Sequence, residues 1–138
     1  MKDLNQSIIN ILVNDSTLAS LMNTTVPNKQ IFTGNVDLIM ETKSTINFPA
    51  IILSGISEVF RTVPLGARDS RIQLDIWDRT SELDIENIYE RVVFLLNYQS
   101  GDINTTHIFW QRGSGLTSQY ESDMRLWHWT TDLTLWSI

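Results

Sequence analysis

The hydrophobic positions follow a helical period at the start of the chain. Across residues 3–14 they recur three and four positions apart and form one stripe: Leu4, Ile8, Ile11 and Leu12. Asp15 or Ser16 then fits the N-cap of a second short helix, because both side chains carry an oxygen that accepts a backbone N–H. This helix is expected to end near Pro27. A short strand at Ile31–Phe32 and one helical turn at Val36–Met40 are expected before the next regular segment.

The period changes to two after Pro49. Ala50–Ile56 is an apolar run that predicts a buried strand, and a strand tolerates proline at its start. Residues 70–78 alternate between two faces, with Ile72, Leu74 and Ile76 on one and Arg71, Gln73, Asp75 and Trp77 on the other. We expect these two strands to form an antiparallel hairpin across a turn at residues 61–67.

A long helix is predicted after this hairpin. Ser81 and Asp84 fit a capping position and an acidic first turn, and the helix should continue to about Tyr98. Its apolar stripe consists of Ile85, Ile88, Tyr89, Val92, Leu95 and Leu96. Two further strands are predicted at His107–Gln111 and Met124–Trp136, with a bend at residues 113–115 between them.

These elements predict the α+β class. The expected architecture is an antiparallel sheet of four to five strands built from two β-hairpins, with the long helix packed on one face and helices at the N-terminus. At 138 residues the chain is expected to form a single domain over residues 1–138.

The composition narrows the classes of function. Ten Lys and Arg against sixteen Asp and Glu give a net charge of −6, which disfavours a mainly nucleic-acid-binding surface. The chain has no Cys, which excludes disulfides, thiolate zinc sites and thiol nucleophiles. No signal peptide pattern is visible, and no run approaches the roughly 20 apolar residues of a membrane span. We therefore expect a protein that is made in the cytoplasm and has no membrane partner.

The titratable residues favour structural roles over catalysis. His107 and His128 have no partner at metal-ligand spacing. Asp75, Asp78 and the glutamates of the long helix resemble paired carboxylates that bind Mg²⁺ or act as acid and base. The same residues fit a strand-to-helix loop and the positive end of a helix dipole. We predict no catalytic, cofactor or metal site. A small metal-dependent hydrolase that uses Asp75, Asp78 and a helix glutamate is the enzymatic alternative.

Five tryptophans are many for a chain of this length. Trp127 and Trp129 share a face with leucines and are expected in the core. Trp77 and Trp136 lie on the opposite faces of their strands, so we expect them to be exposed on the isolated chain. Exposed tryptophans are enriched at protein interfaces, and an interface and ordinary packing under a loop or helix both remain open for these two.

Five segments carry a resemblance to a known family: Asp15–Leu21, Gln30–Phe32, Phe48–Leu53, Arg71–Asp78 and the helix end Val92–Asn97. In this order they resemble the tail-terminator, or tail-completion, family of long-tailed bacteriophages. The resemblance covers roughly residues 8–98. The chain departs from the family in a long segment at residues 34–48 and in the many tryptophans of its last strands.

The resemblance implies a structural virion protein without catalysis or cofactor. Members form a ring, usually of six subunits, that ends polymerisation of the tail tube and joins the tail to the head–neck complex. The implied partners are other copies of the chain, the tail tube protein and a head-completion or connector protein. Genomic DNA would pass through the lumen without specific binding, and a negative net charge agrees with that passage. The implied location is the tail or neck of the virion, after assembly in the host cytoplasm.

An alternative within the same particle is a head-completion or neck adaptor protein. For either role we expect the ring or partner interface to use strand edges, the arm at residues 61–69, the loop at residues 112–123 and the acidic face of the long helix. The candidate interface residues are Arg61, Arg68, Trp77, Glu82, Glu86, Arg112, Arg125 and Trp136.

Overall fold

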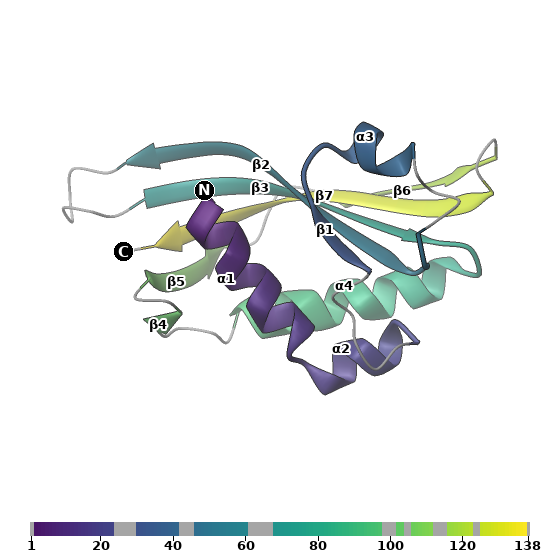
Figure 1. The fold of residues 1–138 in the computed structure, drawn as a ribbon, viewed down its shortest axis with the longest axis horizontal. Helices are drawn as coiled ribbons and strands as arrows, with labels where there is room; N and C mark the ends of the chain where they lie inside the picture. Colours follow the sequence, from purple (N-terminus) through teal and green to yellow (C-terminus); the bar gives the residue numbers. More distant parts are fainter. Residues whose placement is uncertain are drawn as a thin grey trace.

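The computed structural model of the protein describes residues 2–23, 30–41, 46–60, 68–97, 102–103, 106–111, 116–122 and 125–137. The elements follow one another as α1 (Lys2–Val13), α2 (Ser16–Leu21), β1 (Ile31–Thr33), α3 (Val36–Met40), β2 (Ala50–Phe60), β3 (Arg68–Asp78), α4 (Glu82–Asn97), β4 (Asp102–Ile103), β5 (Thr106–Gln111), β6 (Leu116–Glu121) and β7 (Leu126–Ser137). Figure 1 shows the strands running lengthwise through the molecule, with α4 below them and α3 above.

The described strands form one mixed sheet in the order β1-β2-β3-β7-β5-β4, and β6 also pairs with β7. Two strands share the outer edge of β7, because β6 pairs with its first half and β5 with its last four residues. The α+β class and the β2–β3 hairpin are confirmed. The sheet is mixed rather than fully antiparallel, because β1 pairs with β2 in the parallel sense, and the described sheet has seven strands where four to five were expected.

Parallel pairing of β1 follows from the segment that joins it to β2. The chain leaves β1 through a turn at Gly34, forms α3 and returns to start β2 in the same direction. Gly34 has a φ of 133°, a region that glycine enters without steric cost. Its N–H donates to the carbonyl of Leu53, and its own carbonyl accepts the Ser54 hydroxyl at 2.6 Å, so the turn is tied to β2.

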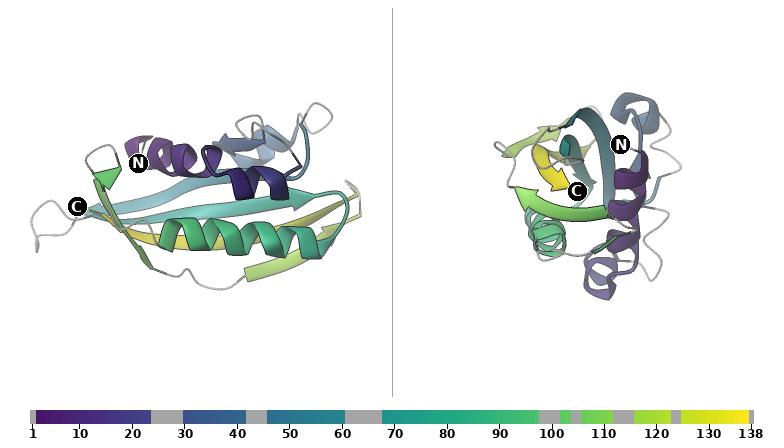
Figure 2. Two further views of the ribbon diagram at one scale, coloured as in Figure 1. Left: turned by 90° about the horizontal axis from the view of Figure 1, so that it is seen from below. Right: turned by 90° about the vertical axis from the view of Figure 1, so that its left-hand side faces the viewer.

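The main core lies between the sheet and α1, α2 and α4, which cover one face (Figure 2). The predicted stripes supply this core: Ile8 and Leu12 from α1, Leu18 from α2, Ile72, Leu74 and Ile76 from β3, and Ile85, Ile88, Val92, Leu95 and Leu96 from α4. Trp129 is buried in the same cluster and Trp127 packs against it, as the alternation of β7 predicts.

A second, smaller core occupies the opposite face of the sheet. Met40 at the end of α3 packs with Ile52, Trp77 and Leu126, and Phe32, Ile39 and Phe48 lie against them. The short helix α3 therefore covers part of the face that the sequence pattern left open to solvent. Both faces of the sheet are apolar at this end, which explains why Ala50–Leu53 is an unbroken apolar run.

Two helix N-caps form as the sequence predicts. The Asp15 carboxylate accepts the Leu18 N–H at 2.8 Å and so caps α2. The Ser81 hydroxyl accepts the Asp84 N–H at 3.2 Å at the start of α4. Each cap satisfies a backbone donor that has no partner inside its own helix.

Candidate interface and the buried Asp75–His128 pair

The eight candidate interface residues are spread over the chain, and the structure describes the side chains of four. Arg61 and Arg112 lie outside the described residues. The side chains of Arg68 and Trp136 also lie outside the described part. Their backbones pair inside the sheet, Arg68 with Phe60 and Trp136 with Asp69. Of the region predicted as a loop at residues 112–123, the part from Leu116 to Glu121 is strand β6 instead.

Glu82, Glu86 and Arg125 are exposed. The two glutamates lie in the first half of α4, whose outer surface also exposes Leu83 (63%). Arg125 lies in the turn between β6 and β7 and has a φ of 56°, a left-handed conformation that is uncommon for a residue with a side chain. All three side chains reach the surface, and their role in an interface stays a prediction.

Trp77 is buried, so of the two possibilities that the sequence left open, the structure shows ordinary packing under a helix and not exposure on the isolated chain. Only 3% of the residue is accessible, because α3 and the second core cover this face of the sheet. Its indole ring stacks on the imidazole of His128, with 3.7 Å between ring centroids and 7° between planes. Trp77 therefore contributes to the fold of the single chain and not to an exposed docking surface.

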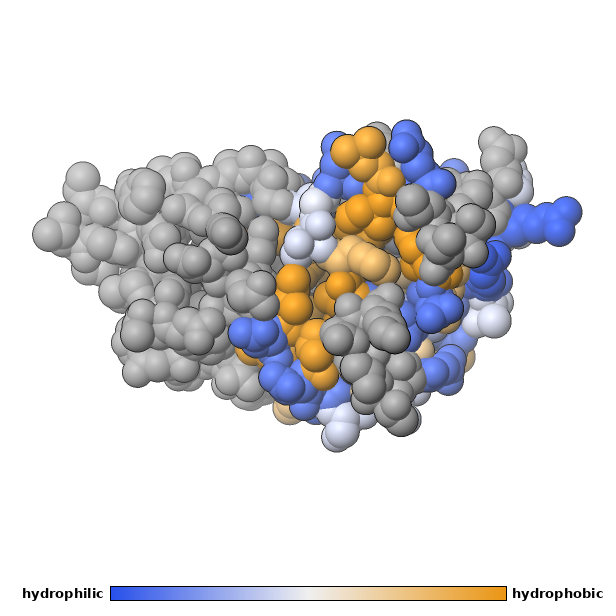
Figure 3. All heavy atoms as spheres, viewed as in Figure 1, coloured by the Kyte–Doolittle hydropathy of each residue, from blue (hydrophilic) through white to orange (hydrophobic). Residues whose placement is uncertain are grey.

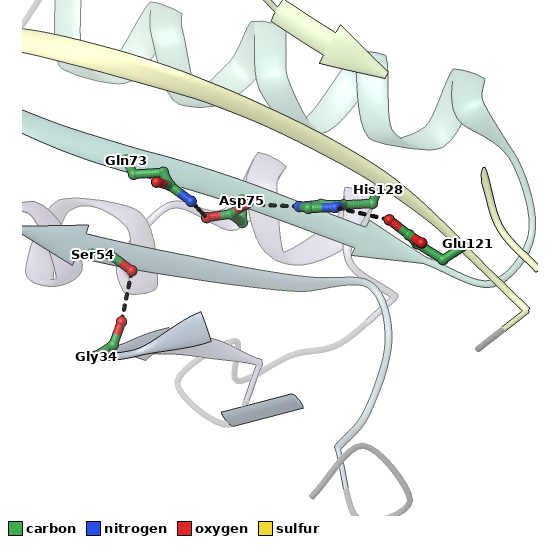
Figure 4. Close-up of polar contacts among 6 residues, drawn as sticks. All are labelled: Gly34, Ser54, Gln73, Asp75, Glu121 and His128. Atoms are coloured by element: carbon green, nitrogen blue, oxygen red, sulfur yellow. Dashed lines mark hydrogen bonds and ion pairs between the residues drawn. The ribbon is translucent and has the colours of Figure 1, made fainter. Parts of the chain in front are cut away.

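The stacked His128 belongs to a line of polar side chains on the same face (Figure 4). Its Nε2 lies 2.7 Å from Asp75 Oδ1, and the other Asp75 oxygen accepts Gln73 Nε2 at 2.7 Å. Asp75 is 1% exposed, so both of its oxygens find partners without access to solvent. A buried carboxylate is costly unless it is paired in this way.

Glu121 is the last residue of this line of polar side chains, and 32% of its side chain is exposed. One of its carboxylate oxygens lies 3.9 Å from His128 Nδ1, so the imidazole ring stands between two acidic side chains. Among the described side chains, the Trp77 and His128 ring nitrogens Nε1 and Nδ1 are buried without a hydrogen-bond partner. The line therefore joins side chains of β3, β7 and β6.

The two aspartates of the hydrolase alternative do not converge. They are three positions apart on β3, and strand alternation directs their side chains to opposite faces of the sheet. Asp75 binds Gln73 and His128, whereas Asp78 accepts the Thr80 hydroxyl at 2.8 Å and backbone N–H groups of the turn into α4. No group of three or more metal-ligating side chains forms among the described residues.

A second ion pair joins the N-terminal helices to α4. Arg91 donates from Nε and Nη2 to the two oxygens of Asp15, at 2.9 and 2.8 Å. The Arg91 guanidinium holds the pKa of Asp15 below its usual value, the Leu18 N–H adds to this shift, and burial opposes it. Asp15 also lines an open cavity of about 380 Å³ with Asn10, Ile11, Asn14 and Leu95.

Hydrophobic side chains also reach the surface around α3. Figure 3 shows them over α3 and in the region below it, on the face that α1 crosses. Leu38 on α3 is 64% exposed, and Phe32 and Ile39 are partly exposed next to the second core. Of these, Phe32 and Ile39 pack against the core that contains Trp77.

The fold can be compared with known proteins on this basis. No protein-family model matches the chain, and no curated protein matches it. The fold is similar to that of a virion protein. That chain belongs to the virion of a native gene transfer agent particle, with a TM-score of 0.56 and 8% sequence identity. The alignment covers 94% of this chain and 90% of the other. At 8% sequence identity, the structural similarity shows a common fold alone.

One further finding concerns membranes. None of the helices in the described part of the chain is long and apolar enough to cross a bilayer.

Proposed function

We propose that the chain is a structural protein of a phage-like virion and that it acts as a tail terminator. In this role, copies of the chain form a ring, with six as the expected number, on the head-proximal end of the tail tube. The ring ends tube polymerisation and offers a surface to the head–neck complex. The observation that carries the proposal is the likeness to a virion chain over nearly the whole length of both proteins.

Two properties of the chain support this role. The sequence segments that resemble tail terminators fall on the framework of the fold: the start of α2, strand β1, the start of β2, and the passage from β3 into α4. The net charge of −6 suits a channel through which DNA moves, because like charges keep the polymer from adhering to the wall.

Light scattering and electron microscopy test the proposal. Six copies of a 15.9 kDa chain have a mass of roughly 95 kDa, and repeated head-to-tail contacts close into a ring when the rotation between copies is suitable. We expect a species of this mass, either in the free protein or bound at the ends of purified tail tubes, and arrest of tube growth when it is added. A chain that stays monomeric and leaves tube growth unchanged would overturn the proposal.

Binding of the protein to tail tubes alone and to head connectors alone also distinguishes a terminator from a neck adaptor. A terminator binds tube ends in the absence of any head protein. Binding to the connector of the head alone, with tube ends left bare, would assign the neck adaptor role and contradict the terminator role.

We also propose that the chain has no metal-dependent hydrolase activity. The carboxylate of Asp75 is engaged by Gln73 and His128, and Asp78 binds the turn before α4. Titration calorimetry with Mg²⁺ and Mn²⁺ should give no saturable heat. Saturable binding that Asp75→Ala abolishes, while Glu41→Ala outside the long helix leaves it intact, would instead support the hydrolase.

A further inference from the structure

Two edges of the sheet carry backbone groups that no described strand pairs. Strand β2 runs to Phe60, but β1 pairs with it only along Ile51–Leu53. On the other side of the sheet, β6 pairs only with β7 among the described strands. Alternate N–H and C=O groups of such an edge point sideways, and the partner that fits them is another β-strand.

The directions of the strands make these two edges complementary. Strand β2 is antiparallel to β3, and β3 is antiparallel to β7, so β2 and β7 run in the same direction. Because β6 is antiparallel to β7, it is also antiparallel to β2. Within one copy β6 lies level with Ala50–Leu53, about six residues or 20 Å along the strands from the free end of β2. A second copy that keeps the same orientation and is shifted by this length therefore brings the free end of its β2 against β6 in the antiparallel sense.

We propose that copies of the chain join head to tail by pairing β6 of one with the end of β2 of the next. This proposal rests on the proposed ring and assigns its contact. A contact between two different edges is heterologous, and repetition of it closes into a ring when the rotation is suitable. Every copy then keeps its helix-bearing face on the same side of a continuous sheet.

The faces of the two strands fix the register. A bulge between Gly55 and Ser57 shifts the alternation of β2, so that Glu58 and Phe60 lie opposite Ser70 and Arg68, on the helix-bearing face. On β6 the register with β7 places Leu116 and Ser118 on this same face, opposite Thr131 and Trp129. A slip of one residue would exchange the faces, so Glu58 and Phe60 must lie opposite even-numbered residues of β6.

The proposed contact uses the register in which residues of matching polarity lie opposite each other at four positions. It places Phe60 opposite Leu116, Val59 opposite Thr117, Glu58 opposite Ser118 and Ser57 opposite Gln119. Apolar and β-branched cross-strand pairs stabilise antiparallel ladders. Neither Ser57–Phe60 nor Leu116–Glu121 contains the Lys or Pro residues with which proteins commonly block an edge from pairing.

Cysteine pairs test this contact directly, because the chain has no native Cys. The double variant Glu58→Cys/Ser118→Cys places two thiols opposite each other between copies. Within one copy these positions are three strand spacings apart, about 14 Å, and six residues apart along the strands, about 20 Å, which gives a separation of about 25 Å. A disulfide needs Cα atoms about 4.4–6.8 Å apart. Oxidation should therefore give a ladder of linked chains that ends at the ring size.

Two further variants control for register and for folding. The pair Ser57→Cys/Gln119→Cys lies in the same register on the other face and should also link. The pair Glu58→Cys/Gln119→Cys directs its thiols to opposite faces and should stay unlinked. Each variant is oxidised free and on tail tubes, and light scattering before oxidation reports whether it assembles.

The outcomes separate the contact from the function. Assembly with linking of the two in-register pairs supports both the contact and the ring. Assembly without linking, or with equal linking of the out-of-register pair, overturns the β6–β2 contact and leaves the ring standing. A wild-type chain that does not assemble, free or on tubes, together with in-register variants that do not link, overturns both.

Discussion

The Asp15 carboxylate serves two parts of the fold, and substitutions at Asp15 separate them. It caps α2 by accepting the Leu18 N–H and pairs with both nitrogen donors of Arg91 on α4. Asp15→Ala removes both interactions. Asp15→Asn keeps an oxygen for the cap, since Asn and Asp are similar as N-caps, and removes only the charge.

The cap dominates the expected loss of stability. Replacement of an N-cap Asp by Ala costs about 1–2 kcal/mol. Because a charged acceptor makes a stronger hydrogen bond, the loss of the Asp15 cap should lie near the upper end of this range. The pair with Arg91 adds less, because 25% of the Arg91 side chain is exposed and solvent screens the attraction. We therefore expect Asp15→Ala to lower Tm by roughly 5 °C and Asp15→Asn by clearly less than half of that.

The pH dependence of stability identifies the charge itself. The pKa of Asp15 is lower in the folded chain than in the unfolded chain, where it is about 3.9. The stabilisation is therefore complete above about pH 4 to 5 and is lost as the pH falls through the folded pKa. Asp15→Asn lacks this carboxyl group, so the stability gap between wild type and variant should narrow below pH 4.

Thermal unfolding gives the Tm values, and urea unfolding gives the free energies of unfolding between pH 2.5 and 7, both followed by tryptophan fluorescence. Asp132→Asn is the matched control, because it breaks a pair with Arg71 whose two side chains are 32% and 51% exposed, and its effect should be within about 0.5 kcal/mol. The reasoning fails if Asp15→Ala matches wild type at pH 7. It also fails if the gap between wild type and Asp15→Asn stays constant down to pH 2.5.

Three other substitutions test separate parts of the structure by the same urea assay. Ile88→Ala removes a fully buried side chain of α4 and should cost about 2–5 kcal/mol, whereas Leu83→Ser on the exposed side should stay within about 0.5 kcal/mol; equal effects would contradict the orientation of the helix. Asp75→Ala leaves His128 and a glutamine without their acceptor and should cost about 2–3 kcal/mol, so a neutral result would show that the buried pair contributes nothing. Arg125→Gly relieves a left-handed backbone and should keep or raise stability by up to about 1 kcal/mol, and a clear loss would show that the arginine side chain stabilises the turn.

The local elements could be predicted from the sequence because their signals are local. The stripe of α4, the Asp15 and Ser81 caps and the alternation of residues 70–78 are each set by neighbours within a few positions. The strand β6 was missed because Leu116–Glu121 has only two widely spaced hydrophobic residues and follows a glycine-rich segment. Its strand conformation depends on pairing with β7 and not on its own composition.

The polar line around Asp75 could not be predicted, because it depends on which strands become neighbours. Alternation places Asp75 and His128 each on one face of its own strand, but they meet only when β3 pairs with β7 across more than 50 residues of chain. The burial of Trp77 could not be decided from the sequence for a related reason. The five-residue helix α3 that covers it is too short to leave a clear period in the sequence.

The pairing of β7 has a consequence for the order in which the protein folds. Among the described strands, β3 meets β5 and β6 only through β7, the last strand in the chain. During synthesis the β2–β3 hairpin and α4 leave the ribosome first, yet one edge of β3 has no partner until β7 arrives. Closure of the sheet is therefore a late step with a long loop to close, and the incomplete chain exposes an open edge next to its core strands. Conditions that slow synthesis of β7 after α4 should therefore increase aggregation of the nascent protein.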